Sequence, residues 1–271
     1  MRFSSWLPLL VALWLGGCGL LPEQVDKTKG WSAQRLYAEA TEQLNEGNYD
    51  KAVEYYQKLE SRFPFGKYAT QAQLNTAYAH YKNGEHEAAL AAIERFERLH
   101  PDHPAMAYAL YLKGLVNFTR NMGFFSRFLP TDNSQRDPGS VQDAYNDFAE
   151  VVRRFPDSEY AEDAKLRMLY LRNMLARHEL HVARYYLDRG ANLAAANRAQ
   201  YVVQHYQYTP SVKDALIIMI IAYERMGEEE LYRDALRVLA YNEKRGNFPT
   251  LKKTDKTLSE KIWEFLELDK G

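Results

Sequence analysis

The sequence predicts an all-α protein built as a solenoid of about five helix-turn-helix units, and three observations support this fold class. Apolar residues recur with helical periodicity from residue 31 almost to the end, and no segment alternates like a strand bounded by turn residues. Glycines recur at repeat-like intervals along the chain, at Gly47, Gly84, Gly139, Gly190 and Gly227. Each glycine is followed after nine positions by an apolar residue, and the first three are followed after seventeen positions by a proline. Self-similarity of this kind is the signature of a repeat architecture.

Each unit can be explained residue by residue. The glycine is expected to end the first helix, because the residue after a helix often has a positive φ. Five positions later an alanine lets two antiparallel helices approach, except in the fifth unit, which has Tyr232. The proline stops the second helix because it cannot continue the hydrogen-bond ladder. This pattern resembles the tetratricopeptide repeat and implies a tetratricopeptide-repeat solenoid.

The repeat domain is predicted over residues 31–244. Its repeats are expected at about residues 33–66, 70–103, 107–158, 159–210 and 211–244. The glycines are 37, 55, 51 and 37 residues apart, so the third repeat has an inserted loop at 121–138 and the fourth is lengthened. Residues 158–189 contain no Gly or Pro, which indicates one long helix, or two nearly continuous ones, joining two packed halves. The inserted loop carries three phenylalanines and is expected to fold back or to contact a partner.

The N-terminus predicts a signal peptide over residues 1–17. Arg2 precedes an apolar run that is too short to span a bilayer, and small residues precede Cys18. The segment Leu15-Gly16-Gly17-Cys18 resembles a bacterial lipobox. The resemblance implies that the mature chain begins at Cys18, which carries a diacylglyceryl group and an N-acyl chain as its covalent lipid. Residues 18–30 would then be a lipidated linker, and Gly19, which is not Asp, indicates the outer membrane; the alternative is a secreted protein with an incidental Cys.

The tail over residues 245–271 is expected to contain an amphipathic helix. Gly246 and Pro249 break the preceding helix, and a capping-box signature runs from Thr257 to Glu260. One apolar stripe follows, made of Leu258, Ile262, Phe265 and Leu266. The stripe either packs back on the solenoid or docks onto a partner.

Several classes of chemistry find no support. The net charge of −1 gives no electrostatic footprint for nucleic acid. A single Cys excludes an internal disulfide and a multi-cysteine zinc site. Glycine-rich phosphate loops and a nucleophile elbow are absent, and His178 and His181 are three apart where the zincin motif needs four. We therefore predict no catalytic residue, no metal and no cofactor, and a protein that is not an enzyme.

The remaining candidate is a protein-binding surface. In tetratricopeptide repeats the first helices line a concave groove, and by this resemblance the groove residues include Tyr37, Tyr78, Tyr81, Lys82, Tyr108 and Tyr111. Rigid amphipathic tyrosines suit extended peptides with aromatic or apolar side chains. The alternative is that these rings pack between helices.

Longer strings identify a family. They include Ser61-Arg62-Phe63-Pro64 with Phe65-Gly66, Arg136-Asp137-Pro138, and Ala196-Asn197-Arg198, none of which a generic repeat consensus requires. With the lipobox and the lengthened third repeat, the chain resembles the BamD family of lipoproteins of the β-barrel assembly machinery. The tail after Arg245 has no counterpart in this resemblance.

The resemblance implies a scaffold that faces the periplasm and is anchored in the inner leaflet of the outer membrane. Its C-terminal repeats would hold the periplasmic domains of BamA, and its N-terminal repeats would receive unfolded outer-membrane β-barrel proteins. Other Bam lipoproteins are implied as further partners. For the BamA side the expected residues are Arg189, Asn197 and Arg198. The alternative function is an adaptor lipoprotein for peptidoglycan enzymes, which is also built from these repeats.

Overall fold

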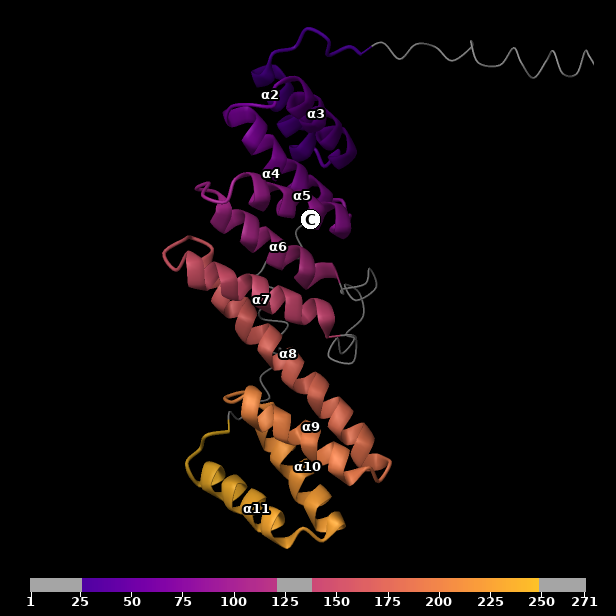
Figure 1. Ribbon diagram of the computed structural model, residues 1–271, viewed down its shortest axis with the longest axis vertical. Helices are drawn as coiled ribbons and strands as arrows, with labels where there is room; N and C mark the ends of the chain where they lie inside the picture. The colour runs from indigo at the N-terminus through magenta and orange to yellow at the C-terminus, as the bar shows by residue number, and fades with distance from the viewer. Residues whose placement is uncertain (1–25, 121–137, 249–271) are drawn as a thin grey trace, which may run out of the picture.

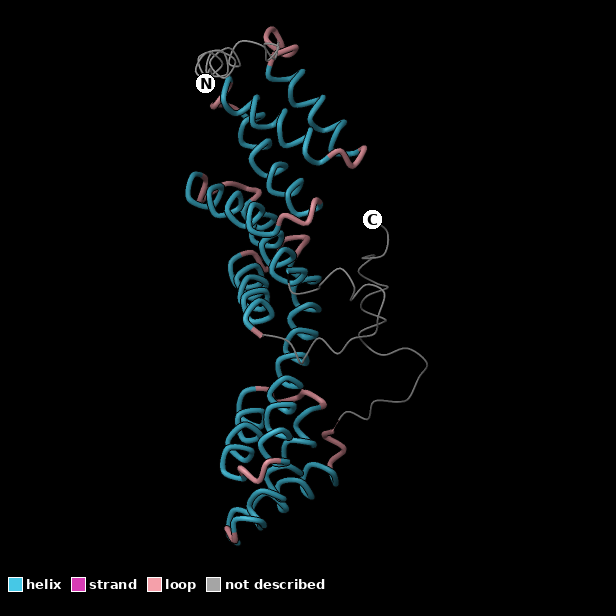
Figure 2. The backbone as a smooth tube through the Cα atoms, turned by 90° about the vertical axis from the view of Figure 1, so that its right-hand side faces the viewer, coloured by secondary structure: helices cyan, strands magenta, loops and turns pink. Residues whose placement is uncertain are grey.

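The computed structural model describes residues 26–120 and 138–248, which fold into helices without any strand in these two ranges (Figure 1). The helices are α2 (Ala33–Asn45), α3 (Tyr49–Arg62), α4 (Lys67–Lys82), α5 (His86–Leu99), α6 (Met106–Arg120), α7 (Gly139–Arg154), α8 (Ala161–Asp188), α9 (Asn192–His205), α10 (Ser211–Met226) and α11 (Glu229–Lys244). Sequential helices pack on one another in an elongated stack (Figure 2). The predicted all-α class is confirmed. None of the described helices is long and apolar enough to span a membrane.

The turns follow the local rules read from the sequence. Helices α3, α5 and α7 each end two residues before a proline, at Pro64, Pro101 and Pro156. The residue before each proline leaves the helical region, with ψ between 54° and 67°, because the proline ring excludes the α conformation there. The paired helices of the first repeat meet at Gly47, whose φ of 78° favours glycine, and Gly84, Gly190 and Gly227 occupy the same place in their repeats.

Gly139 corrects the expectation that every repeat glycine ends a helix. It is the first residue of α7 and is not among the glycines with positive φ. The reason is the insertion, which separates the end of α6 at Arg120 from the start of α7. A first-turn helical residue takes an ordinary helical φ, so Gly139 keeps the repeat register without making the turn.

The buried positions of the repeats form three apolar cores. The first core lies among α2, α3 and α4 and includes Leu36 and Leu59. The second extends from α4 to α8, and the third from α8 to α11. Helix α8 contributes Leu171 to the second core and Ala183 to the third. The glycine- and proline-free stretch therefore forms one 28-residue helix that carries two packed halves (Figure 1).

A polar cluster lies between α5, α6 and α7. Asp147 accepts a hydrogen bond from Nδ2 of Asn117 at 2.7 Å, and Lys113 pairs with Glu97 at 3.5 Å. Burial raises the pKa of Asp147 to about 6, against the opposing effects of Asn117 and Lys113. The folded chain therefore favours the neutral acid.

The pH dependence of stability follows from this shift. Because the pKa of Asp147 is higher in the folded chain than in the unfolded chain, the folded chain binds more protons between about pH 4 and pH 6. Stability at this site therefore increases as the pH falls through 6. We expect Asp147→Asn to raise the free energy of unfolding at pH 7.5 by about 1–2 kcal/mol and to leave it nearly unchanged at pH 3.5, below the ordinary pKa of an aspartate. Urea unfolding at both pH values tests this, with the exposed neighbour Asp143→Asn as control; equal effects of the two variants at pH 7.5 would contradict it.

Candidate functional site

The predicted groove tyrosines fall into two groups in the structure. Tyr37 belongs to an N-terminal tyrosine group on the first core, together with Tyr56 and Tyr68. The other four belong to a central tyrosine group on the second core, together with Tyr160; its members are Tyr78, Tyr81, Tyr108, Tyr111 and Tyr160. Lys82 is exposed at the end of α4. The structure therefore brings Tyr78, Tyr81, Tyr108 and Tyr111 together and leaves Tyr37 apart.

The N-terminal tyrosine group borders a hollow on the first repeat. The ring of Tyr37 lies 5.9 Å from that of Tyr56 and 5.4 Å from that of Tyr68, centroid to centroid. Asn75 donates to both Tyr37 Oη (3.2 Å) and Tyr56 Oη (3.0 Å), which fixes the two hydroxyls. The hollow has a volume of about 570 Å³, and its lining includes Gln34, Tyr37, Thr41, Asn45 and Tyr68. Tyr37 thus presents part of its ring to a cavity wide enough for a side chain.

The tyrosines of the central group are held by ring contacts and a hydrogen bond to neighbouring side chains of the protein. Tyr160 stacks on Tyr111 at 5.1 Å and lies 5.6 Å from Tyr108. Tyr111 Oη donates to Asp163 at 2.5 Å. Burial raises the pKa of both Tyr108 and Tyr111, which keeps the phenols neutral. Tyr78 and Tyr81 lie 6.3 Å apart, and every tyrosine of this group is half-buried.

Tyr68 and Tyr160 are the aromatic residues that the sequence analysis missed. Each follows a repeat proline by four positions, Tyr68 after Pro64 and Tyr160 after Pro156, so both lie where a first helix begins. From that place each ring reaches the tyrosines of the preceding first helix. An aromatic residue four positions after the proline was the signal that could have found them.

A buried arginine, Arg167, packs against the central tyrosine group. Arg167 is 5% exposed, and its Nε donates to Asp163 at 2.5 Å. Its guanidinium carbon lies 5.6–5.7 Å from the ring centroids of Tyr111, Phe118 and Phe148. Cation–π contacts of this kind strengthen when water is excluded. One arginine therefore ties α6 and α7 to α8 at the start of the long helix.

The residues expected to face BamA lie on the α8–α9 hairpin (residues 177–205). Arg189 ends α8 and stacks over the exposed ring of Tyr185 at 4.5 Å. Arg198 pairs with Glu179 at 3.1 Å, and Asn197 is exposed beside it on α9. The Arg198 side chain is about half exposed, whereas that of Glu179 is only 14% exposed, so Arg198 keeps solvent-facing N–H groups that can reach a partner.

Exposed apolar residues accompany these polar groups. Tyr185 is 53% exposed, Leu193 64% and Tyr201 42%. On α9, Leu193, Asn197 and Tyr201 are four residues apart and share one face of the helix. Aromatic and apolar centres bordered by arginines are typical of protein interfaces. The sequence analysis named the polar residues of this surface and did not name its apolar ones.

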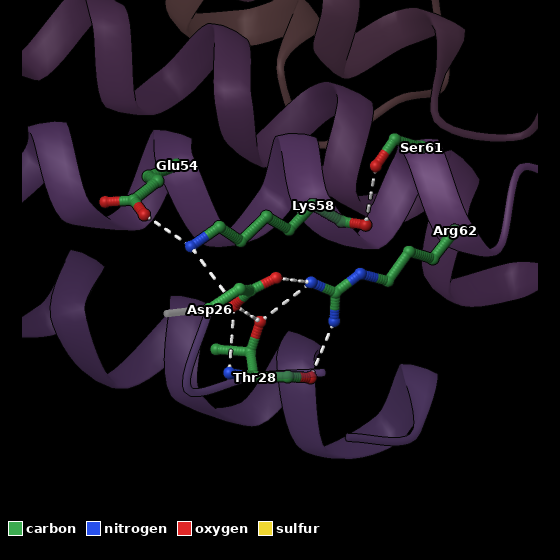
Figure 3. Close-up of polar contacts among 6 residues, drawn as sticks. All are labelled: Asp26, Thr28, Glu54, Lys58, Ser61 and Arg62. Atoms are coloured by element: carbon green, nitrogen blue, oxygen red, sulfur yellow. Dashed lines mark hydrogen bonds and ion pairs between the residues drawn. The ribbon is translucent and has the colours of Figure 1, made fainter. Parts of the chain in front are cut away.

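An N-terminal clamp fixes the start of the described chain on α3 (Figure 3). Arg62 binds Asp26, and its Nη1 donates to the carbonyl oxygen of Thr28 at 2.6 Å. Thr28 is buried and donates to the Asp26 carboxylate from its hydroxyl (2.6 Å) and its amide (2.9 Å). These two hydrogen bonds lower the pKa of Asp26 below its usual value, and the positive charge of Arg62 lowers it further by a smaller amount. Lys58 lies 3.8 Å from the same carboxylate.

Several predicted features lie outside the described residues: the signal peptide at 1–17, the lipidation site Cys18 with the linker up to residue 25, the loop at 121–137 and the tail beyond Phe248. In the part of the chain that is described, no three His, Cys, Asp or Glu residues are placed to hold a metal ion.

Comparison with known proteins gives a consistent result. The family described as "YfiO: Outer membrane lipoprotein" matches residues 30–238. The outer membrane protein assembly factor BamD of Neisseria meningitidis serogroup A is 48% identical over 247 residues, which cover 90% of this chain and 92% of the relative. The BamD of Vibrio cholerae is 38% identical over 227 residues (84% and 93%). That of Haemophilus influenzae is 34% identical over 241 residues (89% and 91%).

Proposed function

We propose that this chain, which belongs to the BamD family of outer-membrane lipoprotein assembly factors, is a non-enzymatic scaffold that holds two kinds of partner at its two ends. The α8–α9 hairpin would bind the periplasmic domains of BamA. The tyrosine groups of the first repeats would receive unfolded outer-membrane β-barrel proteins. The observation that carries this proposal is the separation of the two surfaces along the stack, with α8 running between them (Figure 1).

The lipid anchor would hold the first repeat near the membrane. Asp26, where the clamp begins, follows Cys18 by eight positions. A chain of that length spans at most about 29 Å. With Cys18 lipidated in the inner leaflet, the Asp26–Arg62 clamp would keep the C-terminal end of α3 within about that distance of the bilayer surface.

The client surface would recognise extended aromatic segments. The hollow beside Tyr37 and Tyr68 can take one side chain, and the half-buried rings of Tyr78 and Tyr81 can take another further along. An extended peptide would add main-chain hydrogen bonds to these anchors. Among the predicted residues, Tyr111 has an internal hydrogen bond to Asp163, so we assign it to supporting the groove.

The BamA surface would combine a charged contact with apolar anchors. Arg189 and Arg198 can each form a bidentate pair with a carboxylate of the partner. Tyr185 and Leu193 would become buried between them, which supplies the desolvated centre that strong interfaces need. Other Bam lipoproteins would join the same assembly.

Mutations can distinguish the proposed BamA surface from the proposed client surface. We expect Arg198→Glu to reduce co-purification of BamA from outer membranes at least ten-fold, because it reverses the charge at the interface. The paired change Tyr37→Ala with Tyr78→Ala should leave BamA co-purification intact and weaken crosslinking to a peptide with alternating aromatic residues. Exposed Arg153→Glu on α7 is the matched control for charge reversal. Equal loss of BamA in Arg198→Glu and in the tyrosine variant would refute the division of labour.

A further inference from the structure

The last helix, α11, is less covered than the helices that occupy the same place in the other repeats. Counted from the repeat glycine, the residues at plus five, plus nine and plus twelve are all 0% exposed in α3, α5, α7 and α9. These residues are Ala52, Tyr56, Leu59, Ala89, Ile93, Phe96, Ala144, Phe148, Val151, Ala195, Ala199 and Val202. In α11 the equivalent residues are Tyr232 and Leu239, which are half-buried, and Leu236, which is 38% exposed.

The difference has a simple structural origin. Each earlier second helix packs against the first helix of the next repeat: α3 on α4, α5 on α6, α7 on α8 and α9 on α10. Within residues 26–120 and 138–248, α11 contacts α10 and has no following helix. Solenoids need a terminal element that covers this last apolar face.

The chain itself continues past this point with a suitable segment. The family match ends at residue 238, and 23 residues of the chain follow Phe248. They contain the capping box at Thr257 and the apolar stripe of Leu258, Ile262, Phe265 and Leu266. Such a stripe matches the kind of surface that α11 leaves uncovered.

The dimensions also fit. Phe248 lies beside Lys213, whose Nζ is 6.0 Å from its ring, so the described chain leaves at the end where α10 begins and α11 ends. Residues 249–256 can span at most about 29 Å. A helix over residues 257–268 would be about 18 Å long, against about 24 Å for the 16 residues of α11. The segment can therefore turn back and run antiparallel along α11.

We propose that residues 257–268 form a capping helix that packs its apolar stripe on Tyr232, Leu236 and Leu239 of α11. The cap would complete the third core as α10 completes it over α9. This inference stands independently of the proposed BamA and client surfaces.

A disulfide experiment tests the contact directly. The chain has one cysteine, so the mature protein with Cys18→Ser contains no other thiol. Leu236→Cys would be combined in turn with Ile262→Cys and with Phe265→Cys, and oxidised under mild conditions. We expect at least one pair to close an intramolecular disulfide in most molecules, detected by mass after trypsin digestion. Tyr201→Cys, which is 42% exposed on α9, combined with the same tail cysteines is the control and should not close.

Hydrogen exchange on the full mature chain gives a second readout. Ile262→Asp with Phe265→Asp should raise the exchange rate of α11 amides at least ten-fold and leave those of α3 unchanged, because the cover is lost only at the C-terminal end. As a control, Glu260→Asp with Glu267→Asp alters two carboxylates on the opposite, polar face of the same helix. This variant should leave the exchange rates of both α11 and α3 unchanged. Disulfides that form only between molecules would instead indicate a second copy on α11. That result, or unchanged α11 exchange in the apolar variant, would overturn the proposal.

Discussion

Replacing Arg167 with alanine is expected to lower the free energy of unfolding by about 2–4 kcal/mol, because it removes the buried partner of an ion pair whose carboxylate, Asp163, is only 26% exposed. The carboxylate of Asp163 would lose its cation while remaining beside the Tyr111 hydroxyl. The three rings around the guanidinium, Tyr111, Phe118 and Phe148, would lose their common contact. Urea unfolding followed by circular dichroism measures the loss.

Two controls separate the charge from the packing. Arg153→Ala removes an exposed arginine paired with Glu150 and should cost less than about 1 kcal/mol. Arg167→Met combined with Asp163→Asn removes both charges and keeps an apolar side chain of similar length. This double variant should recover most of the stability, because matched apolar replacement of a buried pair is often neutral. If Arg167→Ala lowered the free energy of unfolding as little as Arg153→Ala does, Arg167 would not hold α6 and α7 to α8.

Replacing Gly114 with alanine is expected to lower the free energy of unfolding by about 2 kcal/mol, although alanine is the better helix former. In an open helix position this change would stabilise by up to about 1 kcal/mol. Here an added Cβ would lie 2.6, 2.8 and 2.9 Å from three ring carbons of Phe148, which is fully buried. Overpacking of a buried site costs about 1–3 kcal/mol and outweighs the gain in helix propensity.

A second substitution tests the cause. Phe148→Leu opens space beside position 114, so the double variant Gly114→Ala with Phe148→Leu should be more stable than the sum of the single changes predicts. Gly30→Ala is the control, because no atom lies within 4 Å of its added Cβ and its φ is not positive. Additive effects in the double variant would show that the Gly114 effect does not act through Phe148.

The two sites of these predictions, Arg167 and Gly114, depend on contacts between helices that the sequence analysis did not identify. Sequence patterns placed Tyr108 and Tyr111 in a groove; in the structure both rings contact Tyr160, and Tyr111 also contacts the guanidinium of Arg167. Tyr111 and Asp163 are 52 positions apart, with the insertion between them. A spacing of that kind depends on how α6 and α8 pack, and no local pattern reports it.

The α8–α9 hairpin was more accessible to sequence reasoning. Arg189, Asn197 and Arg198 lie within ten residues of one another around a single turn, so the sequence alone places them on one hairpin. The pairing of Arg198 with Glu179 was not foreseen, because it depends on the register between two antiparallel helices.

The sequence by itself determined the helices, the ends of most of them, and the repeat register. Proline and glycine act on their own φ and ψ and on those of their neighbours, so Pro64 ends α3 and Gly47 makes the first turn in any context. Gly139 departed from the pattern because an insertion moved the turn away from it. The tertiary structure alone decided which tyrosines remain partly open, that an arginine lies inside the second core, and that no helix among the described residues follows α11 to cover it. Those outcomes depend on distances between side chains of different helices, which are set when the helices pack.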